Sequence, residues 1–215
     1  METLFRQGLA SMGLWLPDDV VGEELLYLDE LLRWNKKINL TSIRNKDSAL
    51  EKHLLDSLTL LKHVKRGESF LDVGSGGGLP GIPVAIADRT LQLVSVDSVG
   101  KKINFQKHIK RILHLNNMQA ENVRVEALGS QGIAAEKFDV VVSRAFSSLE
   151  TILNLTADLV APGGRIIAMR GPEALDEIGQ VEALLEVHRL SEPEIYHYQL
   201  PFTKAERNII IIHKK

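Results

Sequence analysis

Hydrophobic residues follow two different periods along the chain. In the first third, leucines such as Leu25, Leu28 and Leu32 recur at helical spacing, and further on short apolar runs alternate with amphipathic stretches. Extended and helical segments that alternate in this way are typical of an α/β protein with a parallel sheet. We therefore predict an N-terminal helical region, residues 1–66, packed on an α/β core, residues 67–215.

The hydrophobic pattern also predicts the order of the elements. The last two apolar runs follow each other after a short loop, which favours an antiparallel hairpin at the sheet edge. The predicted helices are two within 20–64, the second of them covering 48–64, and four more at 81–87, 99–115, 149–160 and 173–187. The predicted strands are 69–73, 91–96, 123–126, 138–143, 165–169 after the turn Pro162-Gly163-Gly164, 194–200 and 208–213.

The most informative segment is SFLDVGSGGGLPGIP, residues 69–83. An apolar strand ends near an acid, Asp72, breaks into Gly74, Gly76 and Gly78, and continues as a helix. Glycine tolerates positive φ and lets the backbone approach a ligand, so this unit is typical of nucleotide-binding sheets. A structural glycine turn is the alternative, but the acid and the three spaced glycines favour a ligand that lies against these glycines.

The charge around the glycines indicates which ligand binds. A pyrophosphate needs free backbone N–H groups in a positive field, whereas Asp72 carries negative charge, and Pro80 and Pro83 have no N–H. The segment suits a ligand with cationic groups, such as S-adenosylmethionine, and D-x-G-x-G-x-G is the first motif of class I methyltransferases. The alternatives are an NAD-dependent oxidoreductase, which these residues disfavour, and a non-catalytic RNA-binding module with an inactive cofactor fold.

A second acid, Asp97, ends the predicted second strand. An acid at that position can accept both hydroxyls of an adenosine ribose. The structural alternative is a helix N-cap. Both roles are compatible if Ser98 caps the following helix while Asp97 faces the ribose.

The amino-acid composition limits the cellular compartment and the reaction mechanisms that the protein can have. The chain has 215 residues, no cysteine and a net charge of −2. The lack of cysteine fits a reducing compartment and excludes a cysteine nucleophile or metal ligand. No apolar run is long enough to span a bilayer, and residues 1–15 lack the regions of a signal peptide, so we expect a cytoplasmic protein without membrane contact.

Nucleic-acid binding by a chain of negative net charge must use a local basic patch. Two clusters of basic residues could provide it, although most such clusters are solvated helix faces. The first cluster is Arg33, Lys36, Lys37, Arg44, Lys46 and Lys52, and the second is Lys101, Lys102, Lys107, Lys110 and Arg111.

Five segments together resemble the RsmG (GidB) family: WNKKINLT at 34–41, HLLDSL at 53–58, DVGSGGGLPG at 72–81, DSVGKK at 97–102 and SRAF at 143–146. The resemblance covers nearly the whole chain and is weaker beyond about residue 171. It implies a Rossmann-like class I methyltransferase that transfers a methyl group from S-adenosylmethionine to the 7-position nitrogen of a guanine in 16S rRNA. It also implies the cofactor residues Gly74, Leu79, Val125, Glu126 and Arg144.

The motifs that the chain lacks agree with a ring nitrogen as the methyl acceptor. The fourth strand is followed by no Asn/Asp-Pro-Pro-aromatic element, which often serves exocyclic amines, and there is no cysteine to attack a pyrimidine ring carbon. A ring nitrogen with a free lone pair needs only a base held in line with the methyl group. The expected partner is 16S rRNA or the small ribosomal subunit, and we expect a monomer.

Several polar residues can be interpreted as either functional or structural. Arg144, at the end of the fourth strand, either positions the cofactor or the base, as a catalytic residue, or pairs with Asp72 or Glu126. His53 and Asp56 lie one helical turn apart, but without a third ligand a structural hydrogen bond is favoured over a metal. The residues that we expect to contact RNA are Arg33, Lys36, Lys37, Lys101, Lys102 and Arg207, of which Arg207 could equally be an exposed side chain.

Overall fold

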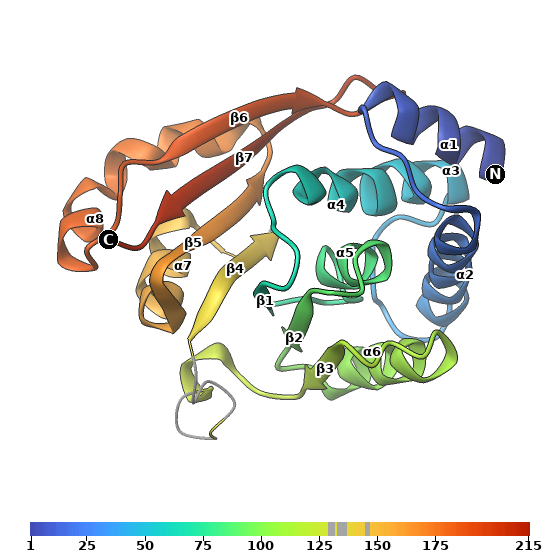
Figure 1. Cartoon of the computed structure of the whole chain (residues 1–215), viewed down its shortest axis with the longest axis horizontal. Helices are drawn as coiled ribbons and strands as arrows, with labels where there is room; N and C mark the ends of the chain where they lie inside the picture. The colour runs from blue at the N-terminus through green and yellow to red at the C-terminus, as the bar shows by residue number, and fades with distance from the viewer. Residues whose placement is uncertain (129–131, 133–136, 145–146) are drawn as a thin grey trace.

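The computed structural model describes the whole chain except residues 129–131, 133–136 and 145–146. A seven-stranded sheet in the order β3-β2-β1-β4-β5-β7-β6 crosses the molecule (Figure 1). Strands β1 to β5 are parallel, and β6 and β7 form the antiparallel hairpin that the sequence predicted. The strands are β1 Ser69–Val73, β2 Gln92–Val96, β3 Met118–Glu121, β4 Phe138–Arg144, β5 Val160–Arg170, β6 Glu194–Gln199 and β7 Glu206–His213.

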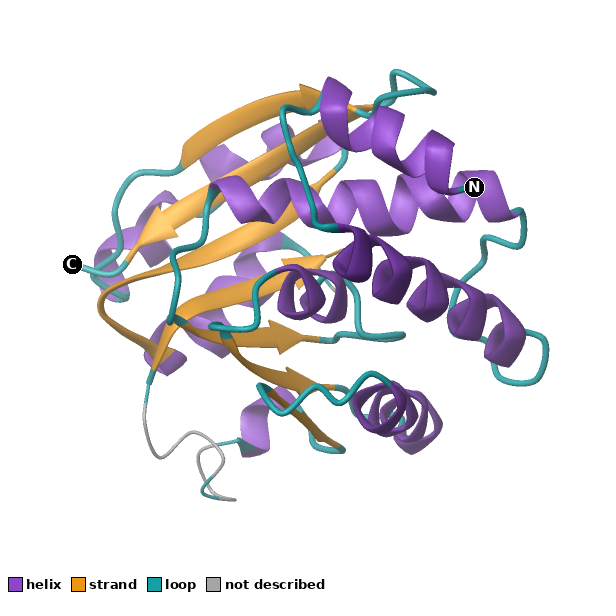
Figure 2. Cartoon of the chain, turned by 45° about the vertical axis from the view of Figure 1, so that its right-hand side comes forward, coloured by secondary structure: helices purple, strands orange, loops and turns teal. Residues whose placement is uncertain are grey.

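Helices cover both faces of the sheet (Figure 2). Alternate strand residues face opposite sides, so Phe70 and Val140 pack against the N-terminal helices, α5 and α6, while Leu71 and Val141 pack against α7 and α8. The α-helices are α1 Glu2–Ser11, α2 Asp18–Asn35, α3 Lys46–Ala49, α4 Asp56–Leu58, α5 Gly81–Ala87, α6 Gly100–Ile112, α7 Leu149–Thr156 and α8 Glu182–Val187. The π-helix is η1 Leu50–Leu55, and the 3-10 helices are η2 Thr59–Lys62, η3 Val125–Ala127, η4 Ala157–Leu159 and η5 Pro172–Gln180.

The N-terminal helices share one hydrophobic cluster with the first face of the sheet. The hydroxyl of Tyr27 in α2 donates to the carbonyl of Gly77 over 2.9 Å. A Cβ placed on Gly77 would lie 2.7 Å from a methyl group of Leu31. Helix α2 therefore packs directly on the glycine loop and helps to hold it. Helix α1, which also joins this cluster, was not predicted.

The predicted third strand, 123–126, is wrong. The strand that pairs with β2 is Met118–Glu121, and residues 125–127 form the 3-10 helix η3. Val123 and Val125 alternate with polar residues as in a strand because both are buried against the second cluster. Their alternation reflects packing over the end of the sheet, where no neighbouring strand is available to pair with them.

Two further boundaries differ from the prediction. The turn Pro162-Gly163-Gly164 lies inside β5, which begins at Val160, and the register with β4 shifts there. Gly163 has φ of +78°, which only glycine adopts easily. The helix predicted over 173–187 is divided at Val181 into the 3-10 helix η5 and helix α8. Within the described residues, no helix is long and apolar enough to cross a membrane.

Candidate functional site

Two hollows lie at the carboxyl edge of the parallel strands, where ligands of such sheets bind. The first hollow, of about 410 Å³, is lined by residues that include Gly74, Val96, Asp97, Lys102, Val125 and Glu126. The second hollow, of about 720 Å³, is lined by residues that include Lys52, His53, Asp56, Arg144, Arg170 and Arg207. Val73 of β1 pairs with Ser143 of β4, so the residues that follow them, Gly74 and Arg144, are neighbours. Gly74 lines the first hollow and Arg144 the second, so the two hollows are built on neighbouring strand ends.

The glycine loop forms one wall of the first hollow. Gly74, Gly76 and Gly78 have φ of +68°, +58° and +87°, a conformation that L side chains rarely adopt. A Cβ on Gly78 would lie 2.2 Å from Cδ1 of Ile82, whereas one on Gly76 would meet open space. The conformation of the loop therefore requires glycine at these positions. Gly74, which has no side chain, exposes its backbone to the first hollow.

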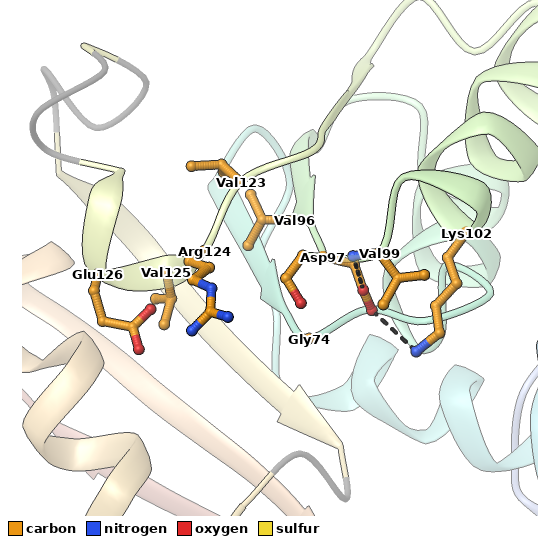
Figure 3. A pocket seen from close by; sticks show the side chains of 10 residues that line it. Gly74, Val96, Asp97, Val99, Lys102, Val123, Arg124, Val125 and Glu126 are labelled. Carbon is orange, nitrogen blue, oxygen red and sulfur yellow. Dashed lines mark hydrogen bonds and ion pairs between the residues drawn. The ribbon is translucent and has the colours of Figure 1, made fainter.

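Asp97 ties the glycine loop to the start of α6, and Figure 3 shows its contacts on the α6 side, with Val99 and Lys102. One carboxylate oxygen accepts the backbone N–H of Val99 over 2.8 Å, and the other accepts that of Gly76 over 2.9 Å. The N-cap of α6 is Val99, which makes no side-chain cap. Ser98 therefore does not cap this helix, and Asp97 accepts the N–H of the N-cap residue Val99, in line with the structural alternative for this acid. Lys102, which we predict to contact RNA, lies 3.5 Å from Asp97.

The remaining walls of the first hollow come from β2 and the segment after β3. Figure 3 shows Arg124 and Glu126 across the hollow from Asp97 and Lys102. Val96 and Val125 add apolar surface between these charged ends. The first hollow is thus lined by the exposed backbone of Gly74, by the carboxylate of Asp97 at the end of β2, and by apolar side chains between its charged ends.

Asp72 lies beneath the glycine loop and is fully buried. One of its oxygens accepts the N–H of Gly81 over 2.8 Å, and the other has no hydrogen-bond partner. Burial raises the pKa of this carboxyl to about 7, against the opposing effects of the Gly81 N–H and Arg144. Asp72 thus holds the start of α5. Leu79, which the resemblance assigned to the cofactor, is almost fully buried in the first hydrophobic cluster.

The second hollow is organised around Asp56. Its carboxylate accepts the Tyr198 hydroxyl over 2.7 Å and lies 3.5 Å from Arg144 and 3.8 Å from Arg207. Arg144 also donates to the carbonyl of Lys52 over 3.1 Å. Arg144 is therefore paired with Asp56, and not with Asp72 or Glu126 as one interpretation of the sequence had it. Its neighbours Ala145 and Phe146 lie outside the described residues.

His53 makes the structural hydrogen bond that the sequence favoured, but with Thr41. The imidazole Nε2 lies 2.8 Å from the Thr41 hydroxyl, and Nδ1 lies 3.2 Å from the carbonyl of Lys52. Burial, and secondarily Arg144, lowers the pKa of His53 to about 4. The ring is therefore neutral at physiological pH. Among the described residues, no three acidic, histidine or cysteine side chains are grouped as a metal site requires.

The other basic residues predicted to contact RNA occupy different settings. Lys36 and Lys37, at the end of α2, and Lys101, at the start of α6, are exposed. Arg33 is exposed too but pairs with Glu30 in the same helix. Arg207 belongs to the second hollow. The structure therefore leaves the α2 terminus and the start of α6 as exposed basic surface.

Sequence reasoning missed several residues of the second hollow. Arg170, at the end of β5, donates to the carbonyl of Ser147 over 2.6 Å, and Tyr198 contacts Asp56 from 142 residues away. No local motif marks either residue. In the first hollow Arg124 was missed, although it directly precedes the predicted Val125.

The parallel sheet with its terminal hairpin, the glycine loop after β1 and the acid after β2 define the class as an α/β methyltransferase fold. The fold is similar to that of a SAM-dependent methyltransferase from Aquifex aeolicus (TM-score 0.52, 16% identity, 77% of this chain and 92% of that one). It is also similar to precorrin-6y C5,15-methyltransferase from Geobacter metallireducens (TM-score 0.57, 16% identity, 75% and 88%). At these identities the comparisons show the fold alone.

Within this class the chain belongs to the GidB family, rRNA small subunit methyltransferase G, whose family model matches residues 23–210. It is 42% identical to ribosomal RNA small subunit methyltransferase G of Syntrophotalea carbinolica, over 100% of this chain and 99% of that protein. It is 39% identical to the protein of the same name from Francisella philomiragia, over 100% and 98%. Membership of this family confirms the predicted enzyme class, an rRNA methyltransferase.

Proposed function

We propose that the chain transfers the methyl group of S-adenosylmethionine to the 7-position nitrogen of a guanine in 16S rRNA. The observation that carries the proposal is that Gly74 of the first hollow and Arg144 of the second follow paired residues of the neighbouring strands β1 and β4. A methyl donor in the first hollow and a base in the second would meet there. The family of the chain supports small-subunit rRNA as the substrate class.

The first hollow fits S-adenosylmethionine. Asp97, at the end of β2, has acceptor oxygens for the ribose hydroxyls, and Val96 and Val125 supply apolar surface for the adenine. Gly74 lets the backbone approach the chain of the ligand that bears its ammonium group. When bound, the donor supplies an electrophilic methyl group on a sulfonium centre. The protein supplies the orientation of that group toward the second hollow.

The second hollow needs no general base for this reaction. The guanine nitrogen has an in-plane lone pair at neutral pH, so no proton must leave before attack. His53 is neutral there, and its Nε2 is engaged with Thr41. The contribution of the residues is therefore proximity and orientation. Arg144, Arg170 and Arg207 offer N–H donors to the phosphate and to O6 of a guanine, which leaves the lone pair of its 7-position nitrogen free.

The proposal is tested by incubating the enzyme with labelled S-adenosylmethionine and unmodified small ribosomal subunits, and in parallel with protein-free 16S rRNA. We expect one labelled guanine, with the label on its 7-position nitrogen as mapped by chemical cleavage. Label on an exocyclic amine or a ring carbon would overturn the choice of atom. Tight donor binding without transfer to either RNA would favour the non-catalytic module, and thermal stabilisation by NADH alone would favour the oxidoreductase.

A further inference from the structure

We propose that Asp56 is a positioning residue for methyl transfer, whose carboxylate holds Arg144 on the donor side and Arg207 on the RNA side of the second hollow. This inference rests on the proposed function and extends it to a residue of the N-terminal helical region. Asp56 would act through the two arginines, without itself touching the reacting atoms.

The position of Asp56 is the first argument. It follows the π-helix η1, a rare distortion that often occurs at functional sites. From there its buried side chain contacts β4 through Arg144, β6 through Tyr198 and β7 through Arg207. One carboxylate thus joins three strands, from distant parts of the chain, around one hollow.

The charge arrangement is the second argument. Arg144 and Arg207 are two cations that share one buried carboxylate, and without it they would repel each other. Tyr198 remains a neutral donor to Asp56, because burial, followed by the charge of Asp56, raises the pKa of its hydroxyl well above the usual value. Arg144 contacts Asp56 and the carbonyl of Lys52, and Arg207 contacts Asp56 and the carbonyl of Glu206. These contacts use only part of the five N–H donors of each guanidinium. The remaining donors can bind a nucleotide in a fixed orientation.

A purely structural role is the competing explanation, and Glu51 shows what such a role looks like. Glu51 lies in the π-helix η1, which Asp56 directly follows, and is also buried. One of its carboxylate oxygens accepts the backbone N–H groups of Phe202 and Thr203, over 2.6 and 2.8 Å, in the turn between β6 and β7. Glu51 therefore fastens the hairpin through its backbone, whereas Asp56 contacts side chains that line the hollow.

The test compares Asp56→Asn with Glu51→Gln as a matched control, and with Tyr198→Phe. Single-turnover methyl transfer to unmodified small subunits, S-adenosylmethionine affinity by calorimetry and melting temperature are measured on each folded variant. We expect Asp56→Asn to lower the transfer rate about tenfold or more, as for the loss of hydrogen bonds to a charged group, with donor affinity changed less than about threefold. Tyr198→Phe should lower the rate less, because the carboxylate and both arginines remain.

Glu51→Gln should lower the melting temperature while the transfer rate stays near that of the wild type. The inference is overturned if Asp56→Asn transfers methyl groups at the wild-type rate. It is equally overturned if Glu51→Gln loses as much rate as Asp56→Asn at an equal loss of melting temperature, since the effect would then be structural. If the wild-type enzyme itself labels no guanine nitrogen, the proposed function fails, and that outcome is read separately from these variants.

Discussion

The two hollows at the carboxyl edge of the sheet are built in different ways. The first is made largely by backbone, from the glycine loop and from turns that Asp97 fastens through two amide bonds. The second is made by long side chains that converge on Asp56 from separate segments. The difference suggests that the first hollow is rigid before its ligand binds, whereas the second depends on the balance of its charges.

The strongest test of this comparison is Arg144→Ala. We expect the single-turnover methyl-transfer rate to fall by about 10²–10³-fold, as when a preorganised donor is removed from an active site. The affinity for S-adenosylmethionine should fall much less, because Arg144 lines the second hollow. Arg66→Ala, which removes an exposed arginine just before β1 at the opposite edge of the sheet, is the control and should change neither quantity.

The contributions of His53 and Asp72 to folding stability should change with pH in opposite directions. The pKa of His53, beside the second hollow, is about 4 in the folded chain and about 6.5 when unfolded. The unfolded state then binds more protons between these values, so this contribution to stability, up to about 3 kcal/mol, is lost as the pH falls from 6.5 to 4. The difference in unfolding free energy between wild type and His53→Gln, measured by denaturant titration, should therefore grow with pH.

Asp72, beneath the first hollow, has the reverse sign. Its pKa rises from 3.8 to about 7 on folding, so the folded state binds more protons and this residue costs stability, on the order of 3 kcal/mol, as the pH rises from 4 to 7. The advantage of the wild type over Asp72→Asn should then shrink with pH. A pH-independent difference for either variant would contradict the burial argument for that residue.

Asp97→Ala should weaken S-adenosylmethionine binding by roughly 1.5–3 kcal/mol, or about 10- to 150-fold, through loss of the ribose acceptor. Asp88→Ala is a matched control. The Asp88 carboxylate accepts the N–H of Thr90 as that of Asp97 accepts the N–H of Val99, but it precedes β2 at the opposite edge of the sheet. Calorimetry should show wild-type affinity for this control. Unchanged affinity in folded Asp97→Ala would remove Asp97 from the donor site.

The smallest expected effect belongs to the basic surface at the end of α2. Replacing Lys36 and Lys37 together by alanine should reduce the slope of log K against log salt for rRNA binding by about 1.4–1.8. Donor affinity should be unchanged. The equally exposed pair Lys65 and Arg66, before β1, provides a control of equal charge. Equal slopes for both double variants would mean that Lys36 and Lys37 are only solvated.

The contrast between the hollows also explains what the sequence could predict. The glycine loop, the acid after β2 and the terminal hairpin follow from short motifs and local periods, because each depends on neighbours in the sequence. Asp56 and Tyr198 are 142 residues apart, and no local pattern brings them together. The misplaced third strand has a related cause, since Val123 and Val125 have the alternation of a strand without a partner strand. Tertiary packing determines both the contact between Asp56 and Tyr198 and the structure of residues 123–126.

The central claim is that the donor and the guanine occupy adjoining hollows that meet at Gly74 and Arg144. A structure of the enzyme with S-adenosylhomocysteine on an unmodified small ribosomal subunit tests it most directly. We predict a guanine in the second hollow, beside Arg144, with its 7-position nitrogen facing the sulfur of the ligand, so that a methyl group on that sulfur would lie about 3–3.5 Å from the nitrogen. A guanine bound elsewhere, or one that turns its exocyclic amine toward the sulfur, would contradict the account.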